Sequence, residues 1–286
     1  MRLKGTIIKG IGGFYYVRAA DGSVHECRAC GRFRKEHILP MIGDDVEIEN
    51  SSVVEIYPRR SYLTRPPVAN IDSLIVVAAA AQPDPNLFLL DKMLVTAEYK
   101  EIEPIVCINK TDLKSSDDLR LIYETAGYRT LCVCAQTGEG TDKLIPILSN
   151  KTTAFAGLSG VGKSTILSDI TGIGLETGGV SEKIHRGRHT TRHVELMEVH
   201  GGGLVFDTPG FSSLEMEDIK VADLWKCFPE MRGFDGLCRF RGCAHVAEPD
   251  CAVREAVERG DIAQSRYESY KQIYDILKQR KDWEKQ

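Results

Sequence analysis

The sequence predicts a multidomain protein with three parts: an N-terminal β-barrel of the oligonucleotide-binding (OB) type, a central α/β domain and a mainly α-helical C-terminal domain. Three observations predict this arrangement. Short alternating strands separated by turn residues fill residues 1–65, buried parallel strands alternate with helices over 66–218, and a cysteine/histidine cluster precedes a helical pattern within 219–286. These three ranges are the predicted domains.

The composition is that of an ordinary globular protein. Of the 286 residues, 42% are hydrophobic and 27% are charged, and the formal net charge is −4. No apolar run reaches the roughly 18–20 residues of a membrane span, and the first residues lack the apolar segment of a signal peptide. We therefore expect a cytoplasmic protein that does not associate with membranes. Its nine cysteines are then thiols or metal ligands rather than disulfides.

Residues 1–65 predict a closed barrel of five strands. The alternating runs cover residues 3–8, 14–18, 24–28, 45–49 and 52–57. This stretch carries 11 Lys/Arg against 8 Asp/Glu, and the resulting net charge of +3 is weak evidence for an acidic partner.

Basic and aromatic side chains of the barrel offer phosphate contacts and stacking surfaces for RNA. They are Arg28, Arg32, Arg34, Lys35, Phe33, Tyr15 and Tyr16. A solvated charged loop beside core aromatics has the same composition, so both interpretations stay open. Cys27 and Cys30 resemble half of a zinc site, but no second ligand pair lies nearby. We expect their role to be structural or incidental.

A base-reading site is predicted in the first half of the α/β domain. Apolar runs at 73–81 and 104–108 flank a predicted helix near 86–100, and the second run leads into Asn109, Lys110, Thr111 and Asp112. Ligands bind beyond the carboxyl ends of such strands. Asp112 can accept hydrogen bonds from N1–H and the N2 amino group of guanine, whereas adenine has neither donor there. The next strand, at 130–134, leads into residues 135–140, which are candidates to offer backbone N–H groups to the guanine oxygen; Cys134 and Ala135 are the candidate base-site residues there.

Residues 157–165 predict a phosphate-binding loop, the P-loop. An apolar strand at 153–156 precedes them and a helix follows at 165–170, which is the context that the motif requires. Glycines let the backbone wrap closely around an anion, and the helix N-terminus adds unpaired N–H groups. The expected phosphate-binding residues are Gly157, Leu158, Ser159, Gly160, Val161, Gly162, Lys163, Ser164 and Thr165. Lys163 is expected to reach the outer phosphates and Ser164 to bind Mg²⁺.

Further contacts to Mg²⁺ and the γ-phosphate are predicted downstream. Asp207 follows an apolar strand at 203–206 and is placed like a carboxylate that holds Mg²⁺ through water, and Gly210 offers an amide to the γ-phosphate. Thr190 or Thr191 is a candidate second Mg²⁺ ligand, and the sequence does not choose between them. Their basic stretch, 185–193, is also typical of a solvated loop, and ordering by γ-phosphate and Mg²⁺ is compatible with that.

A structural zinc site is predicted in the last part of the chain. Cys238, Cys243, His245 and Cys251 lie within fourteen residues, in a polar segment with too few apolar residues to fold unaided. Three buried thiols and a chance histidine are the alternative. Cys227 is expected in the core. Beyond Asp250, a candidate N-cap, aromatic and apolar residues at three- and four-residue steps predict a helix: Tyr267, Tyr270, Tyr274 and Leu277.

The order of these motifs is unusual. In most GTPases the P-loop comes first and the Asn-Lys-x-Asp motif follows the Asp-x-x-Gly motif, whereas here 109–112 precedes both 157–165 and 207–210. With its preceding barrel and cysteine/histidine tail, the chain resembles the family of ribosome small-subunit-dependent GTPase A (RsgA, YjeQ/YloQ). The resemblance covers essentially the whole chain and implies a circularly permuted P-loop GTPase domain in the centre.

That resemblance also implies a function. It implies a Mg²⁺-dependent hydrolase converting GTP to GDP, which binds the small (30S) ribosomal subunit and its 16S rRNA, assists late subunit maturation, and is stimulated by the subunit. We expect a monomer. His189 matches the family's Gly-x-His-Thr-Thr stretch and is the candidate for positioning water; a loop histidine bonded to RNA phosphate or solvent is the alternative. Phe211 stands where many GTPases have a water-orienting glutamine, so slow intrinsic hydrolysis is expected.

Two other functions stay open on the sequence alone. One is a nucleotide-gated RNA-binding switch whose hydrolysis is incidental, and Phe211 agrees with it. The other is an adenine-using P-loop enzyme such as a small-molecule kinase, and residues 109–112 speak against it.

Overall fold

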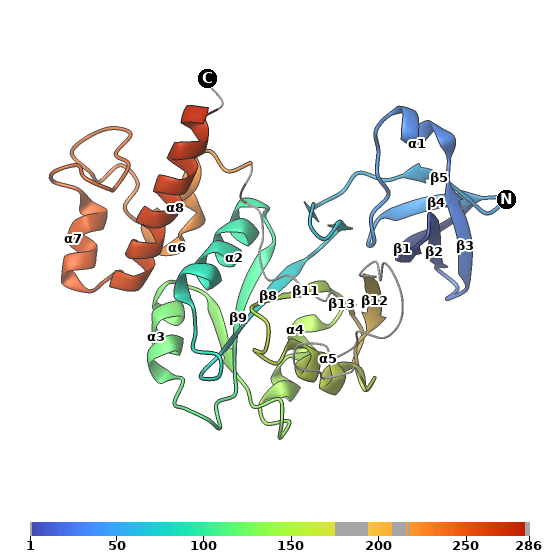
Figure 1. Cartoon of the computed structure of the whole chain (residues 1–286), viewed down its shortest axis with the longest axis horizontal. Helices are drawn as coiled ribbons and strands as arrows, with labels where there is room; N and C mark the ends of the chain where they lie inside the picture. Colours follow the sequence, from blue (N-terminus) through green and yellow to red (C-terminus); the bar gives the residue numbers. More distant parts are fainter. Residues whose placement is uncertain (1, 175–193, 208–215, 217, 284–286) are drawn as a thin grey trace.

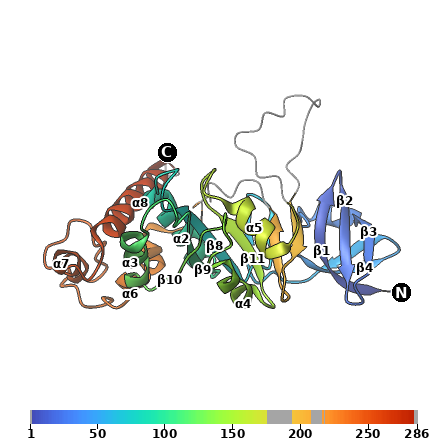
Figure 2. The same cartoon turned by 90° about the horizontal axis from the view of Figure 1, so that it is seen from below.

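The computed structural model describes residues 2–174, 194–207, 216 and 218–283. Within these ranges the molecule is elongated: the N-terminal strands lie at one end, an α/β domain lies in the middle and the C-terminal helices lie at the other end, as Figure 1 and Figure 2 show. None of the described helices combines the length and apolar character needed to span a membrane.

The N-terminal strands form a closed five-stranded barrel, as predicted. The strands follow the order β1-β2-β3-β5-β4, and β4 pairs back onto β1. Val17, Val46 and Val53 are fully buried inside it, because alternate residues of each strand face the interior. The elements are β1 Leu3–Ile11, β2 Phe14–Ala19, β3 Val24–Ala29, α1 Gly31–Lys35, β4 Asp45–Glu49 and β5 Ser52–Ile56.

The central domain is built on a parallel sheet with the order β10-β9-β8-β11-β13, and β12 pairs antiparallel with β13. Every residue of β8 is buried, as expected for a strand covered on both faces. The strands are β8 Ser73–Ala79, β9 Glu103–Asn109, β10 Arg129–Cys132, β11 Thr152–Ala156, β12 Glu195–Glu198 and β13 Leu204–Asp207, and a small sheet of β6 Tyr62–Leu63 and β7 Val68–Ala69 precedes them.

Helices cover the two faces of this sheet. Side chains of α2 and α3 pack with Leu74, Val76 and Ala78 of β8 in one core cluster, while α4 and α5 pack with the alternate residues Ile75 and Val77 in another. The helical segments are α2 Leu87–Tyr99, α3 Asp117–Thr125, the 3₁₀ segment η1 Thr141–Lys143, α4 Ile145–Leu148 and α5 Lys163–Thr171. The sequence pattern did not predict α3, although Asp117 and Asp118 in its first turn are a helix-start signal.

The C-terminal part contains η2 Val221–Cys227, α6 Pro229–Arg232, α7 Ala252–Arg259 and α8 Gln264–Trp283. The expectation of one helix capped by Asp250 is wrong. Gly260, with φ 83°, ends α7 before α8 begins. Cys251 holds the N-cap position of α7, whereas Asp250 has φ 50° and its Oδ2 accepts a hydrogen bond from Arg239 Nη1 at 2.6 Å. Cys227 is buried, as predicted.

The barrel joins the central sheet through β1 and β12. Lys9 is paired in register with Glu195, and its Nζ lies 2.7 Å from Glu195 Oε2. Gly43, with φ 94°, lies at the same junction, where a Cβ would stand 2.1 Å from the carbonyl oxygen of Ala69 and 3.2 Å from the Phe206 ring. Only glycine fits this position. The barrel and one face of the central sheet therefore share a single core.

A fully buried arginine ties the C-terminal helices to the central domain. Arg266 of α8 and Asp91 of α2 are both 0% exposed, and Arg266 Nη1 lies 2.6 Å from Asp91 Oδ1. Glu230 of α6 lies 2.7 Å from Arg266 Nε, and the Tyr123 hydroxyl donates to Asp91 Oδ1 at 2.9 Å. Burial raises the pKa of Asp91, and the charge of Arg266 opposes that rise. Because an unpaired charge at this depth is costly, the pair holds α8 and α2 in one arrangement.

Replacing this arginine should destabilise the protein strongly. In Arg266→Met, Asp91 and Glu230 stay buried without their cation, so we expect the free energy of unfolding to fall by about 3–5 kcal/mol. Urea unfolding followed by tryptophan fluorescence measures the change. Lys278→Met, at an exposed position of the same helix, is the matched control and should change stability by about 0.5 kcal/mol or less. Equal effects of the two substitutions would contradict the role given to the buried pair.

Candidate functional site

Three loops and one strand end meet at the carboxyl edge of the parallel sheet. The loops follow β9, β10 and β11, and β13 ends at Asp207 beside β11. Parallel strands direct all their carboxyl ends to the same edge. The predicted base-reading and P-loop residues, which are up to 56 residues apart in sequence, are therefore neighbours here. His189, Thr190, Thr191 and Gly210 lie outside the described residues.

The backbone of the P-loop requires glycine at two positions. Gly157 has φ 144°, and a Cβ there would lie 2.3 Å from the carbonyl oxygen of Val77. Gly162 has φ 97° and precedes the first residue of α5, and a Cβ there would lie 2.2 Å from Asn109 Nδ2. The loop thus turns tightly between β11 and the N-terminus of α5, where free backbone N–H groups favour an anion. Ser164, in the first turn of α5, is exposed at this site.

Lys163 lies along the inside of the P-loop. Its Nζ donates to the carbonyl oxygens of Gly157 and Leu158, each at 2.8 Å. Burial lowers the pKa of Lys163 to about 8. The ammonium group is therefore positioned by neutral carbonyls, and a polyphosphate at this place would supply the negative charge that the site lacks.

The buried side chain of Asn109 connects the P-loop to the loop after β10. Its Nδ2 donates to the carbonyl oxygen of Val161 at 2.9 Å, and its Oδ1 accepts from the backbone N–H of Ala135 at 3.0 Å. This contact alters the expectation for Ala135, because its N–H, expected to be a candidate for the guanine oxygen, has an internal partner in this structure. Asn109 therefore acts as a spacer between the two loops.

The carboxylate of Asp112 is exposed at the sheet edge. Its Oδ1 accepts a hydrogen bond from the Cys134 thiol at 3.1 Å. Cys134 is buried and its backbone N–H donates to the carbonyl oxygen of Glu139 at 2.9 Å, so the thiol orients the carboxylate from a fixed loop. Lys110 Nζ donates to the carbonyl oxygen of Gln82, and Thr111 Oγ1 donates to that of Val133 at 3.2 Å. All four residues of the predicted base-reading loop are thus positioned by neighbouring strands and loops.

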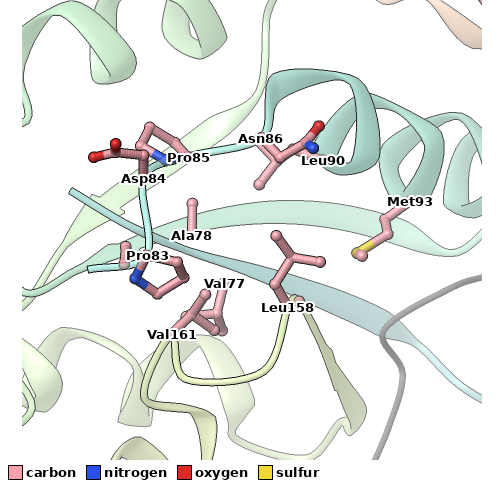
Figure 3. A pocket seen from close by; sticks show the side chains of 12 residues that line it. Val77, Ala78, Pro83, Asp84, Pro85, Asn86, Leu90, Met93, Leu158 and Val161 are labelled. Atoms are coloured by element: carbon pink, nitrogen blue, oxygen red, sulfur yellow. The ribbon is translucent and has the colours of Figure 1, made fainter. Parts of the chain in front are cut away.

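Figure 3 shows a small apolar hollow behind the P-loop, lined by Leu158 and Val161 of the P-loop, Pro83, and Leu90 and Met93 of α2. Its free volume is about 10 Å³, which is about the room of one water molecule. The hollow is therefore a small gap in the packing between the P-loop and α2, and it is too small to be a ligand site. The sequence pattern did not predict that α2 lies next to the P-loop, although the apolar residues of α2 were a visible signal.

The predicted metal ligands converge in the C-terminal part. The ligand atoms of Cys238, Cys243, His245 and Cys251 all lie within 4.8 Å of one another. Cys238 Sγ is 3.5 Å from His245 Nδ1 and 3.9 Å from Cys251 Sγ, and His245 Nδ1 is 3.4 Å from Cys251 Sγ. Around a tetrahedral zinc ion, bond lengths of about 2.0–2.3 Å place neighbouring ligand atoms roughly 3.5–3.8 Å apart. The donor set and its spacing therefore fit a closed Cys₃His zinc centre.

Glu248 organises the metal loop, although no local pattern of the sequence marks it. Its carboxylate accepts from the backbone N–H groups of Ala244, Val246 and Ala247 at 2.8, 3.0 and 3.1 Å. Burial alone would raise the pKa of Glu248, but these hydrogen bonds outweigh it and lower the pKa to about 2. Burial raises the pKa of Cys243 to about 12, so a cation binding there must displace the thiol proton.

Comparisons with known proteins agree over nearly the whole chain. A family model described as RsgA GTPase matches residues 56–217, and one described as RsgA N-terminal domain matches residues 4–55. The chain is 44% identical to the small ribosomal subunit biogenesis GTPase RsgA of Agathobacter rectalis, covering 98% of this chain and 100% of that one. It is 48% identical to the protein of the same name from Caldanaerobacter subterraneus subsp. tengcongensis, covering 94% of each.

Solved structures are similar over the same length. YloQ, described as a circularly permuted GTPase, is 38% identical with a TM-score of 0.80, and the match covers 98% of this chain and 96% of YloQ. YjeQ from Thermotoga maritima is 35% identical with a TM-score of 0.81, covering 97% of this chain and 99% of YjeQ.

The lowered pKa of Lys163 predicts a pH dependence of nucleotide binding. Phosphates favour the charged amine and raise the pKa of Lys163 above 8. Just above pH 8, nucleotide binding should therefore be accompanied by uptake of as much as about one proton per nucleotide. The affinity for nucleotide should fall as the pH rises further. Calorimetric titration with GDP at pH 8.5, in two buffers of different ionisation enthalpy, counts the proton. Lys163→Arg keeps a permanent charge and should lose the proton uptake; the same uptake in both proteins would rule out Lys163 as its source.

Removing the Glu248 carboxylate should weaken metal binding. Glu248→Ala leaves three backbone N–H groups without their acceptor, so we expect about 10- to 100-fold lower zinc affinity, as for other residues that orient metal ligands. Competition with a chromophoric chelator measures it. Glu255→Ala, at an exposed position of α7, is the control. If both variants retain zinc equally, Glu248 does not organise the loop.

Proposed function

The chain belongs to the RsgA GTPase family and is a GTPase of small ribosomal subunit biogenesis, and on that premise we propose that GTP binds across the carboxyl edge of the central sheet. The observation that carries the proposal is the Asn109 side chain, which is hydrogen-bonded to the P-loop at Val161 and to the loop after β10 at Ala135. A nucleotide needs its base site and its phosphate site at a fixed separation, and this contact sets it.

The base is read by Asp112 in this proposal. Its carboxylate accepts the N1–H and N2 hydrogen bonds of guanine, with the Cys134 thiol 3.1 Å away supporting one oxygen. Adenine would lie against the same carboxylate without donating a hydrogen bond to it, so we expect ATP to be a poor substrate. The remaining base contacts fall to Asn109, Lys110 and Thr111, and to groups of Cys134 and Ala135 other than their backbone N–H groups, which are paired with Glu139 and Asn109.

The phosphates lie in the P-loop, residues 157–165, with Lys163 at the outer phosphates. Mg²⁺ bound with GTP neutralises charge on the β- and γ-phosphates. Ser164 and Asp207 would hold it, together with Thr190 or Thr191, and the Gly210 amide would contact the γ-phosphate. Phe211 has no hydrogen-bonding group to orient water, so we assign that task to His189 and expect the ribosomal subunit to complete the site.

The domains at the two ends of the molecule flank the GTPase domain. We propose that the barrel, residues 1–65, binds the 16S rRNA of the small (30S) subunit, and that residues 219–286 form a second domain around one structural Zn²⁺ held by Cys238, Cys243, His245 and Cys251. The GTPase domain between them is residues 66–218. The protein works as a cytoplasmic monomer during late subunit maturation. A nucleotide-gated RNA-binding switch with incidental hydrolysis is the second candidate, because Phe211 favours slow turnover.

The proposal predicts GTP turnover that rises strongly with purified small subunits and not with large subunits or with ATP as substrate. Asp112→Asn sharpens the assay. Its amide can donate to the C2 oxygen of xanthine, so this variant should lose about 100-fold or more in GTP affinity and hydrolyse XTP instead, still stimulated by small subunits. Unstimulated wild-type turnover contradicts the ribosomal role, and unchanged GTP affinity of Asp112→Asn contradicts the base site. Stimulated release without faster single-turnover hydrolysis would favour the switch.

A further inference from the structure

The loop that follows β10 is only partly fixed by its own packing. We call residues 135–140, Ala-Gln-Thr-Gly-Glu-Gly, the base loop. The backbone N–H of Cys134 donates to the carbonyl oxygen of Glu139 at 2.9 Å, which closes the loop. Gln136, Thr137 and Glu139 are exposed. In the described part of the chain the backbone N–H of Gln136 has no acceptor, so the base loop keeps a donor where the sequence predicts one for the guanine oxygen.

Thr141 connects the end of the base loop to the P-loop helix α5. The residue is 4% exposed, and its Oγ1 donates to Asp169 Oδ2 of α5. The carbonyl oxygen of Gly138 lies 2.8 Å from the same Oγ1. A threonine hydroxyl has a single proton, and a carboxylate is a stronger acceptor than a backbone carbonyl. The hydroxyl is therefore directed mainly towards α5.

Helix α5 is a fixed point for this attachment. Ile166, Leu167 and Ile170 are buried in the core on one face of the central sheet. Asp169 is exposed and lies six residues after Lys163, the first residue of the helix, which is about 9 Å along the helix axis. A group that is held by Asp169 is therefore also held at a set distance from the phosphate-binding lysine.

The base loop is thus attached at both ends to the unit that binds the phosphates. At its start, the Ala135 N–H donates to Asn109 Oδ1, and Asn109 Nδ2 donates to the P-loop at Val161. Just after its end, Thr141 is bonded to Asp169. Without the second attachment the loop would be held at its start only, whereas the P-loop and Lys163 would keep their contacts.

We propose that the hydrogen bond between Thr141 and Asp169 sets the rate at which guanine nucleotide leaves the site. The bond holds the base loop against the guanine, and the nucleotide leaves when the loop moves. This inference rests on the proposed function for the position of the base. Thr141 and Asp169 are positioning residues, because they act on the nucleotide through the base loop. The phosphate site is not disturbed by their loss, so nucleotide release should change while the hydrolysis step does not.

The test measures release of GDP that carries a fluorescent group on its ribose, from full-length protein, after addition of excess unlabelled GDP. Thr141→Val keeps the shape of the side chain but removes the donor. It should release GDP about tenfold faster, as expected for loss of a hydrogen bond to a charged, exposed group. Asp169→Ala should have the same effect, and the double variant should be no faster than either single variant, because the two residues form one contact. Thr141→Ser keeps the hydroxyl and should release GDP at the wild-type rate.

Thr171→Val is the matched control. Thr171 is also a buried threonine of α5, but its Oγ1 donates to the carbonyl oxygen of Leu167 within the helix, at 2.6 Å. This variant should therefore leave the release rate unchanged. A second measurement separates positioning from general damage to the site. For Thr141→Val and Asp169→Ala, the single-turnover rate of GTP hydrolysis at saturating GTP should stay within about twofold of the wild type.

Wild-type release by both single variants would overturn the proposal. Additive effects of the two substitutions, or a fall in the single-turnover rate as large as the change in release, would also overturn it. Asp169 is exposed, so Asp169→Ala provides the test even if Thr141→Val does not fold. If the wild-type protein itself does not bind GDP, the proposed function fails first.

Discussion

The nucleotide site depends on one buried amide. Asn109 donates to the P-loop at Val161 and accepts from the loop after β10 at Ala135, so a single side chain uses both of its polar ends. Aspartate at this position would lose the donor and leucine would lose both contacts, which leaves buried backbone groups unpaired. Gly162 belongs to the same constraint, because a side chain there would displace Asn109 Nδ2. The phosphate and base sites are therefore one unit, although the chain builds the base site first.

The central domain is anchored on both sides in different ways. The barrel shares an apolar core with it and adds β1 to the edge strand β12. The C-terminal helices are held through α2, by the buried pair Asp91–Arg266. Leu90 and Met93 of the same helix line a small hollow together with Leu158 of the P-loop (Figure 3). Helix α2 therefore lies next to the phosphate-binding loop and contacts the helices of the domain that carries the metal centre.

Much of this organisation could be predicted from the sequence. The five barrel strands, the strand–P-loop–helix unit around Lys163 and the four metal ligands each have a local pattern, so chain order alone finds them. The contacts that position these residues have no such local pattern in the sequence. These contacts join segments that are distant in sequence: Asn109 with Ala135, Cys134 with Asp112, and Arg266 with Asp91. A single sequence, read by itself, contains no information about which distant residues pair. Glu248 was missed for another reason: its partners are backbone N–H groups, which every residue has. The division between α7 and α8 was missed, although Gly260 between them is a local helix-stop signal.

The distance in sequence between Asp91 and Arg266 has a consequence for synthesis of the chain. The carboxylate and its guanidinium partner are 175 positions apart, so α2 leaves the ribosome long before the residue that neutralises it. Until α8 is made, the central sheet can form but its helix carries a carboxylate that cannot be buried at low cost. A polypeptide truncated before α8 would keep that charged, incompletely packed surface. Such a surface distinguishes an unfinished chain from a finished one and exposes it to chaperones and proteases.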